Sequence, residues 1–281
     1  MSSLRATLLG SIAVLLWALL ALFTTLSGGL PPFQLSAISF ALGAAIGLPS
    51  LIRQRARLKG LPLRVWLLGV GGIFGYHFFY FTALANAPAA EASLVAYLWP
   101  LFIVLFSALL PGEKLRAGHM VGALIAFGGG AMLIARTGFD IAPEYWLGFG
   151  AAALCALIWS GYSVASRAVG AVPSIIIAAY CAISALLALA SHLLWETTVW
   201  PQTTQAWLAL LALGLGPVGL AFYVWDIGVK RGNIQLLGVL AYAAPVLSTL
   251  VLVLAGLAPA TPVLLGAAAL IAFGALVAAR A

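Results

Sequence analysis

Apolar residues in this chain form long runs instead of alternating with polar residues. Runs of about 20 apolar residues recur from one end to the other, with most charged residues in the short segments between them. As a helix, a run of that length crosses the ~30 Å hydrocarbon layer of a membrane. The pattern predicts ten membrane-spanning helices, at residues 6–26, 33–52, 65–86, 91–110, 117–136, 146–166, 172–194, 206–228, 236–256 and 262–279.

Composition agrees with this pattern. Hydrophobic residues make up 64% of the 281 residues and charged residues only 7%. A soluble domain has roughly a quarter charged residues, so this chain could not cover a surface facing water. The first run is too long for the core of a signal peptide and no clear cleavage site ends it. We therefore expect an all-α integral membrane protein.

Basic residues predict the orientation. With the N-terminus in the cytoplasm, all 13 Lys and Arg except Arg136 fall in cytoplasmic segments, whereas Glu91, Asp140, Glu144 and Glu196 fall outside. This is the positive-inside bias of membrane proteins, and ten spans then place both termini in the cytoplasm. The net charge of +7 is spread over several loops. It therefore reflects topology and predicts no nucleic-acid partner.

Two motifs occur twice. The segment 96–100 reads AYLWP and recurs at 241–245 as AYAAP, 145 positions later. The segment 123–128 reads ALIAFG and recurs unchanged at 269–274, 146 positions later. A duplication at this spacing divides the chain into two halves of nearly equal length.

The halves predicted by this duplication are residues 1–141 and 142–281, with five spans each. Because five is odd, the second half enters the membrane from the opposite side. The repeats are therefore expected to be inverted, about an axis in the membrane plane. Inverted repeats are typical of secondary transporters that open a central site to one side and then to the other, so we expect alternating access.

The repeated motif ends in proline, at Pro100 and Pro245. Proline removes a backbone donor and clashes with the carbonyl four residues earlier, here that of Ala96 or Ala241. A static bend is one interpretation, and a hinge with a carbonyl that faces the substrate is the other. The occurrence of the same proline motif in both halves favours the hinge.

Depth in the membrane separates the nine tryptophans. Trp66, Trp225 and four others lie near span ends, where an interfacial belt explains them. Trp17, Trp99 and Trp159 lie about mid-span, where the indole N–H needs an internal partner or a hydrated cavity. Packing in the core is the alternative for each, but we expect a cavity.

Span 65–86 has the most polar interior. Tyr76, His77 and Tyr80 project over one face of that helix. His77 is the ionisable side chain nearest the midplane apart from tyrosines, which favours a cavity-lining role over a buried structural hydrogen bond. Further aromatic residues predicted to line the cavity are Tyr97, Tyr162, Tyr223 and Tyr242.

Small residues mark the fifth helix of each half, among them Gly118, Gly122 and Gly266. They permit close helix approach, either within a monomer or in a dimer, and we favour a monomer. Cys155 and Cys181 lie mid-helix without metal spacing, and the three histidines are scattered. No metal, cofactor or catalytic site is therefore predicted, and an enzyme is not expected.

These spans, the repeat and the proline motifs combine with further short motifs: GEK at 112–114, IW at 158–159, WDIG at 225–228 and GN at 232–233. Together they resemble the drug/metabolite transporter superfamily, in its EamA-type ten-helix branch. The resemblance covers nearly the whole chain. It implies export of amino acids, aromatic ones and others, across the bacterial inner membrane. It also implies a central cavity lined by spans 1, 3, 4, 6, 8 and 9.

The alternative function is a multidrug or small-metabolite proton antiporter of the same superfamily. A cation/proton exchanger of that kind has a carboxylate within the membrane, and here no Asp or Glu lies mid-span. An uncharged aromatic cavity suits a zwitterionic or neutral small molecule and broad selectivity. Facilitated diffusion is the simplest coupling, with His77 as the proton carrier otherwise.

Overall fold

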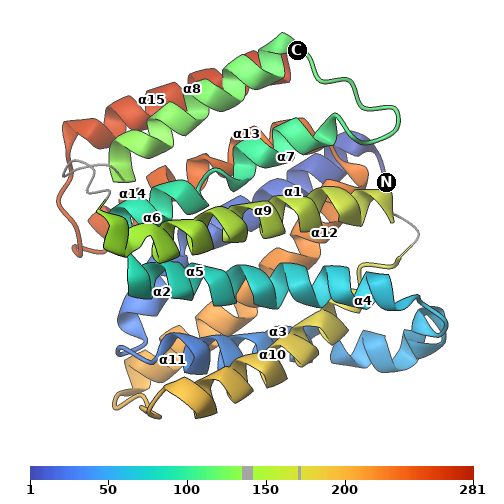
Figure 1. The fold of residues 1–281 in the computed structure, drawn as a ribbon, viewed down its shortest axis with the longest axis vertical. Coiled ribbons are helices and arrows are strands. Elements are labelled where there is room, and N and C mark those ends of the chain that lie inside the picture. Colours follow the sequence, from blue (N-terminus) through green and yellow to red (C-terminus); the bar gives the residue numbers. More distant parts are fainter. Residues whose placement is uncertain (135–141, 170–171) are drawn as a thin grey trace.

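The computed structural model describes residues 1–134, 142–169 and 172–281 (Figure 1). Arg136 and Asp140, which were predicted to lie outside the cell, are not among the described residues. Within it, nine helices are long and apolar enough to cross a membrane, and Ala117–Met132 is a shorter apolar helix. Each of the ten predicted spans coincides with one of these segments to within six residues at either end.

Several spans are divided into shorter helices. In chain order the helical elements are α1 (Ser3–Ala18), α2 (Leu20–Leu26), α3 (Pro32–Gln54), η1 (Arg55–Leu58), α4 (Leu63–Val70), η2 (Gly71–Gly75), α5 (Tyr76–Asn86), α6 (Ala89–Ala96), α7 (Trp99–Ser107), α8 (Ala117–Ile134), η3 (Pro143–Tyr145), α9 (Trp146–Ala168), α10 (Ile176–Trp195), α11 (Thr204–Leu213), η4 (Gly214–Leu220), α12 (Ala221–Arg231), α13 (Ile234–Ala241), α14 (Ala243–Leu254) and α15 (Pro262–Ala279).

Two of the divisions are π-helical segments, η2 and η4, in the third and eighth spans. Both are rich in glycine, and η4 also contains Pro217. Close packing requires some of these glycines: a Cβ on Gly72 would run into the ring of Tyr162. Widened turns of this kind redirect a helix and often occur at functional sites. The sequence interpretation treated both spans as continuous helices.

The first span is divided at Leu19, and two further divisions occur at the duplicated proline motif. Helix α6 ends at Ala96 and α7 begins at Trp99, while α13 ends at Ala241 and α14 begins at Ala243. Each helix therefore stops at the residue whose carbonyl a continuous helix would press against the proline ring. The disruption expected at both prolines is present as a break in the helix.

The spans pack in pairs drawn from the two halves of the chain. Helix α8 lies along α15 at one edge of the molecule, and α3 lies along α10 at the other (Figure 1). Between these edges α1 packs on α12, α5 on α9 and α7 on α13. Small residues allow the α8–α15 contact, because a Cβ on Gly122 would lie 2.5 Å from the carbonyl oxygen of Gly274. The small residues of these two helices thus pack within one chain.

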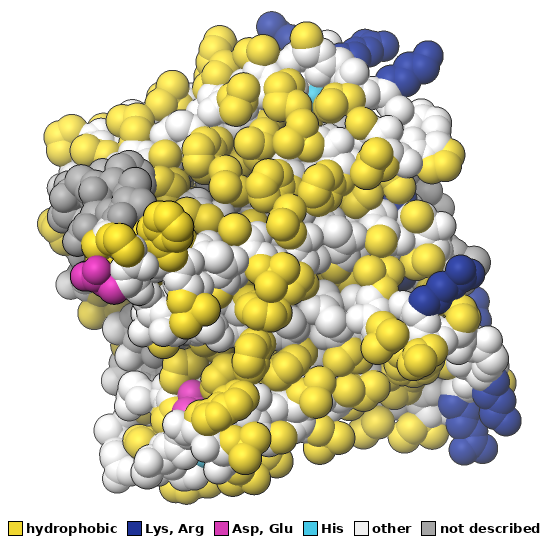
Figure 2. Space-filling view, viewed as in Figure 1, with side chains coloured by type: hydrophobic (Ala, Val, Ile, Leu, Met, Phe, Trp, Pro, Cys, Tyr) yellow, Lys and Arg dark blue, Asp and Glu magenta, His cyan; other side chains and the backbone are white. Residues whose placement is uncertain are grey.

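The molecule has two distinct ends. Both termini lie at the same end (Figure 1), and the Lys and Arg side chains visible in Figure 2 gather there. We call this the basic end; it includes the loop of residues 53–64 with Arg53, Arg55, Arg57, Lys59 and Arg64. At the opposite end, Glu196 accepts hydrogen bonds from the backbone N–H groups of Phe33 and Gln34 and so caps α3.

Candidate functional site

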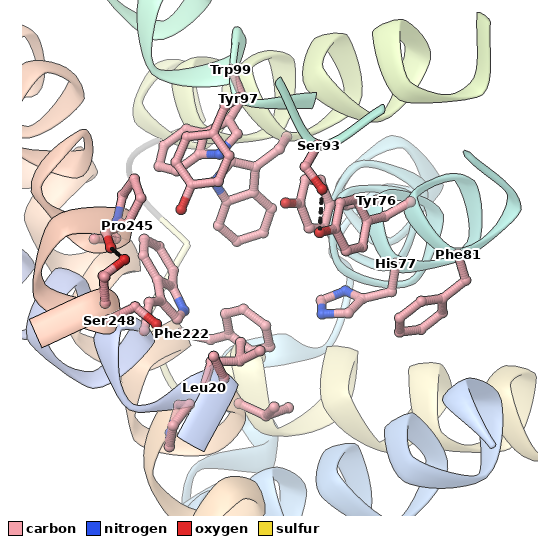
Figure 3. Close-up of a pocket in the computed structure, with 18 residues that line it drawn as sticks. Leu20, Tyr76, His77, Phe81, Ser93, Tyr97, Trp99, Phe222, Pro245 and Ser248 are labelled. Carbon is pink, nitrogen blue, oxygen red and sulfur yellow. Dashed lines mark hydrogen bonds between the residues drawn. The ribbon is translucent and has the colours of Figure 1, made fainter. Parts of the chain in front are cut away.

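A cavity of about 380 Å³ lies in the interior, between helices from both halves of the chain (Figure 3). Seven of the ten side chains that the sequence suggested line it: Trp17, Tyr76, His77, Tyr80, Tyr97, Trp99 and Trp159. They come from the first, third, fourth and sixth spans. Sequence analysis did not name the other lining residues, which come from the first, third, fourth, eighth and ninth spans: Leu20, Ala21, Phe81, Ser93, Pro217, Val218, Phe222, Ala244, Ser248 and Thr249.

The cavity occupies the half of the molecule remote from the basic end. Many of its residues belong to α2, α5, α6 and α14, the parts of these spans that approach the opposite end. A second cavity of about 340 Å³ adjoins it, shares His77, Tyr80 and Phe81, and extends to Thr24 and Ser36. The space thus runs from the middle of the molecule toward the opposite end.

Three tryptophans, Trp17, Trp99 and Trp159, form the floor of the cavity, and a fourth, Trp225, packs against them without lining it. The ring of Trp17 lies 6.0 Å from that of Trp99, 5.9 Å from that of Trp159 and 5.0 Å from that of Trp225, between centroids. The assignment of Trp225 to an interfacial belt is wrong: it is 1% exposed, and its indole N–H donates to the Ser163 hydroxyl at 3.1 Å. Helix α12 continues to Arg231, so Trp225 lies farther from the helix end than the predicted span placed it.

Helix α5 supplies the most polar wall. The rings of Tyr76 and Tyr80 stack at 5.9 Å, and the Tyr80 hydroxyl lies 3.3 Å from that of Ser93 on α6. His77 hydrogen-bonds through Nδ1 to the backbone carbonyl of Ile73 at 2.8 Å, while its ring points into the cavity (Figure 3). The predicted shared face of these three α5 residues is present.

Helix α14 forms the facing wall, with Pro245, Ser248 and Thr249. The Thr249 hydroxyl donates to the Pro245 carbonyl at 2.9 Å. Pro245 thus faces the cavity as part of this wall. Its counterpart Pro100 is buried instead, and its carbonyl lies against Gly238. The two prolines have the same local role but different surroundings.

Three candidate tyrosines are not among the residues that line the cavity. Tyr162 is buried against Gly72 of the π-helical segment. The Tyr223 hydroxyl donates to the carbonyl of Gly43 at 2.9 Å. Tyr242 is fully buried, and its hydroxyl accepts the N–H of Leu101 at 3.1 Å. Each was expected to complete the aromatic lining. Instead, the hydroxyl or ring of each tyrosine contacts the backbone of a neighbouring helix.

At the basic end, tight packing and ion pairs close the space below the tryptophans. Glycines bring two helices together there, since a Cβ on Gly228 of α12 would lie 2.6 Å from the Cα of Gly10 on α1. Nearer the surface, Arg167 pairs with Glu113. Lys230 pairs with the buried Asp226 at 2.9 Å.

The cavity itself is uncharged apart from any charge on His77. Its lining, within the described residues, contains no Asp, Glu, Lys or Arg. Groups of His, Cys, Asp and Glu that could hold a metal ion are likewise absent from the described parts of the chain. Rings, hydroxyls and indole N–H groups are what it offers a small molecule, in a volume typical of small-molecule sites.

Known proteins share this architecture. The model of the EamA-like transporter family matches the chain twice, at residues 4–135 and 146–280. The aromatic amino acid exporter YddG of Ancylobacter novellus is 55% identical over 99% of this chain and 98% of its own. The pseudopaline exporter CntI of Pseudomonas aeruginosa is 30% identical over 69% of this chain and 68% of its own. A solved crystal structure with 54% identity superposes with a TM-score of 0.95, over 99% of this chain and 98% of that one.

Family, relatives and apolar spans agree that this is a multi-pass transporter of the bacterial inner membrane and not an enzyme. The chain belongs to the EamA-like transporter family.

Proposed function

We propose that this protein exports amino acids, with aromatic ones among its substrates, through the central cavity. The observation that carries this proposal is the 55% identity, over 99% of the chain, to the aromatic amino acid exporter of Ancylobacter novellus. Nine aromatic or imidazole side chains around one uncharged cavity support the same substrate class. Rings contact an aromatic side chain face to edge, and the surrounding hydroxyl and N–H groups meet the polar ends of an amino acid.

The lining also supports broad selectivity. Contacts between rings and an apolar side chain are largely non-directional, so aliphatic and aromatic side chains can occupy the same space. A cation/proton antiporter would have a carboxylate facing the cavity, and the described lining has none. We therefore favour movement down the amino acid gradient, and His77 is the group that a proton-coupled version would use.

Alternating access between two inverted repeats is the second part of the proposal. The family model matches each half separately, which supports repeats at 1–141 and 142–281. Spans also pack in the pairs that a two-fold axis in the membrane plane would exchange: the first with the eighth, and the sixth with the third. With the basic end in the cytoplasm, this structure is open outward, and the breaks at Pro100 and Pro245 are the hinges.

Transport by the purified protein tests this function. Proteoliposomes loaded with unlabelled amino acid should take up labelled phenylalanine, tryptophan and threonine by exchange, at rates well above those of protein-free liposomes. Uptake in the absence of a pH gradient is expected if the amino acid gradient drives transport. If no amino acid is exchanged, the proposed substrate class is wrong; if exchange requires an imposed pH gradient, the antiport alternative replaces facilitated diffusion.

A further inference from the structure

The tautomer of His77 follows from its hydrogen bond. The Nδ1 atom lies 2.8 Å from the backbone carbonyl oxygen of Ile73. A carbonyl oxygen only accepts hydrogen bonds, so Nδ1 must carry the proton. In the neutral ring the other nitrogen, Nε2, then has a lone pair and no proton. The backbone of α5 thereby makes Nε2 an acceptor.

The surroundings of the ring favour this neutral form. His77 packs edge to face against Phe40 at 5.0 Å and against Phe222 at 6.1 Å, between centroids. No carboxylate lines the cavity in the described part of the chain, so an imidazolium would face the cavity without an anionic partner. A buried charge in that position is costly. Figure 3 shows the ring directed into the cavity from α5.

The other polar side chains of the lining differ from Nε2 in kind. The hydroxyls of Tyr80, Ser93 and Ser248 can either donate or accept, and the indole nitrogens of the lining tryptophans only donate. These groups can all serve a carboxylate. Among the described lining residues, His77 Nε2 is therefore a side-chain atom that can accept a hydrogen bond but cannot donate one.

We propose that His77 Nε2 accepts a hydrogen bond from the ammonium group of the substrate, and that it thereby selects for an amino group. This inference rests on the proposed amino acid export and deepens it. The substrate ring lies toward the tryptophan floor, while hydroxyl and indole donors meet the carboxylate. An aromatic acid without an amino group offers no hydrogen-bond donor to Nε2. It would place a carboxylate or an apolar group there and leave that acceptor unpaired.

Competition by an analogue of the same ring size tests the inference. Exchange of labelled phenylalanine in proteoliposomes is measured against unlabelled phenylalanine and against 3-phenylpropanoate, which keeps the carboxylate alone. A hydrogen bond to a charged group is worth about tenfold or more in affinity. 3-Phenylpropanoate differs from phenylalanine only in lacking the amino group, so we expect phenylalanine to compete at least tenfold better than 3-phenylpropanoate. Equal competition by phenylalanine and 3-phenylpropanoate would overturn the inference without any variant.

Variants locate the effect at His77. His77→Phe keeps a ring among its aromatic neighbours but removes the acceptor, and should reduce the preference for phenylalanine over 3-phenylpropanoate at least threefold. His77→Gln provides an amide oxygen that can accept, and should retain more of the preference than His77→Phe. His119→Phe makes the same change at a histidine outside the cavity lining; it is the matched control and should leave the ratio unchanged.

The outcomes separate the two proposals. If wild-type protein exchanges no phenylalanine, the proposed function fails and this inference fails with it. If phenylalanine is exchanged but His77→Phe keeps the full preference for phenylalanine over 3-phenylpropanoate, amino acid transport stands and the role of His77 Nε2 is wrong.

Discussion

The same tyrosine-proline motif occupies two different environments in this molecule. Tyr97 lines the open cavity, whereas Tyr242, 145 positions later, is fully buried with its hydroxyl on the N–H of Leu101. Pro245 faces the cavity and Pro100 is packed against Gly238. Local sequence therefore explains the break in each helix, while the surrounding helices decide whether the break is exposed or closed.

The open and closed halves also differ in chemistry. The open half is lined by rings and hydroxyls and contains no ion pair among its described lining residues. The closed half is held by Gly10 against Gly228, by Arg167 with Glu113, and by Lys230 with Asp226. The Arg167–Glu113 and Lys230–Asp226 pairs therefore contribute to closing the basic end. The following tests address this difference, in order of decreasing effect.

The largest expected difference is in labelling from outside the cell. Single cysteines replace Arg57 in the basic loop and Thr198 at the opposite end, both exposed, in a chain carrying Cys155→Ala and Cys181→Ala. An impermeant thiol reagent added to intact cells should label position 198 and not position 57. Lysed cells, in which both positions should react, are the control. The reverse pattern would place the basic end outside and contradict the proposed outward-open orientation.

Filling the helix contact at the basic end should abolish or strongly reduce transport. The Cβ of Gly228→Ala would lie 2.6 Å from the Cα of Gly10, so α1 and α12 must separate. Overpacking of this kind costs about 1–3 kcal/mol, and it acts on the closed half alone. Gly161→Ala is the control, since no atom lies within 4 Å of its added Cβ. Equal melting temperatures and exchange rates for the two variants would show that this contact does not support closure.

Truncating the cavity wall should change selectivity. Trp99→Ala and Tyr80→Ala remove ring contacts that a large substrate uses more than a small one. The ratio of phenylalanine to threonine exchange should fall about fivefold or more, at an estimated 25 cal/mol per Å² of lost contact. Trp66→Ala removes a ring of α4 that packs on Tyr180 instead, and should affect only stability. An unchanged ratio in both cavity variants would return Trp99 and Tyr80 to a structural role.

Sequence predicted the spans well because the length and polarity of each run are local properties. It also brought Trp17, Trp99 and Trp159 together, since all three lie mid-span. It failed for Trp225 and for Tyr162, Tyr223 and Tyr242, whose partners Ser163, Gly72, Gly43 and Leu101 come from distant segments. Position along a span gives depth, but the direction of a side chain depends on which helix lies beside it.

The π-helical segments were missed for a related reason. The glycines of 71–75 and 214–220 were visible, and Pro217 among them breaks the regular hydrogen-bond pattern. Which glycine makes a close contact depends on the neighbour: Gly72 meets Tyr162, whereas Gly71 has open space where its Cβ would be. Matched glycine clusters in the third span of each half were the signal that could have found both segments.

Restoring helical continuity should slow the exchange between the two environments. Pro100→Ala and Pro245→Ala each supply a backbone N–H and remove a clash, which favours an unbroken helix. We expect the rate of exchange to fall several-fold while the concentration for half-maximal exchange changes little. Pro49 lies inside α3 and outside the cavity lining, so Pro49→Ala is a control for loss of a helical proline. Parental rates in both motif variants would make the breaks static bends.

The smallest and most specific effect is expected at the matched tyrosine hydroxyls. Tyr242→Phe removes the acceptor for the Leu101 N–H and should cost the closed basic end about 1 kcal/mol. In this conformation the Tyr97 hydroxyl lies at the cavity, so Tyr97→Phe should cost the same structure little. The expected result is a lower melting temperature for Tyr242→Phe than for Tyr97→Phe. Exchange should slow in both variants, because each hydroxyl would close one end in turn. If the repeats do not exchange environments, Tyr97→Phe should instead leave the exchange rate unchanged, and only the buried tyrosine would contribute to transport.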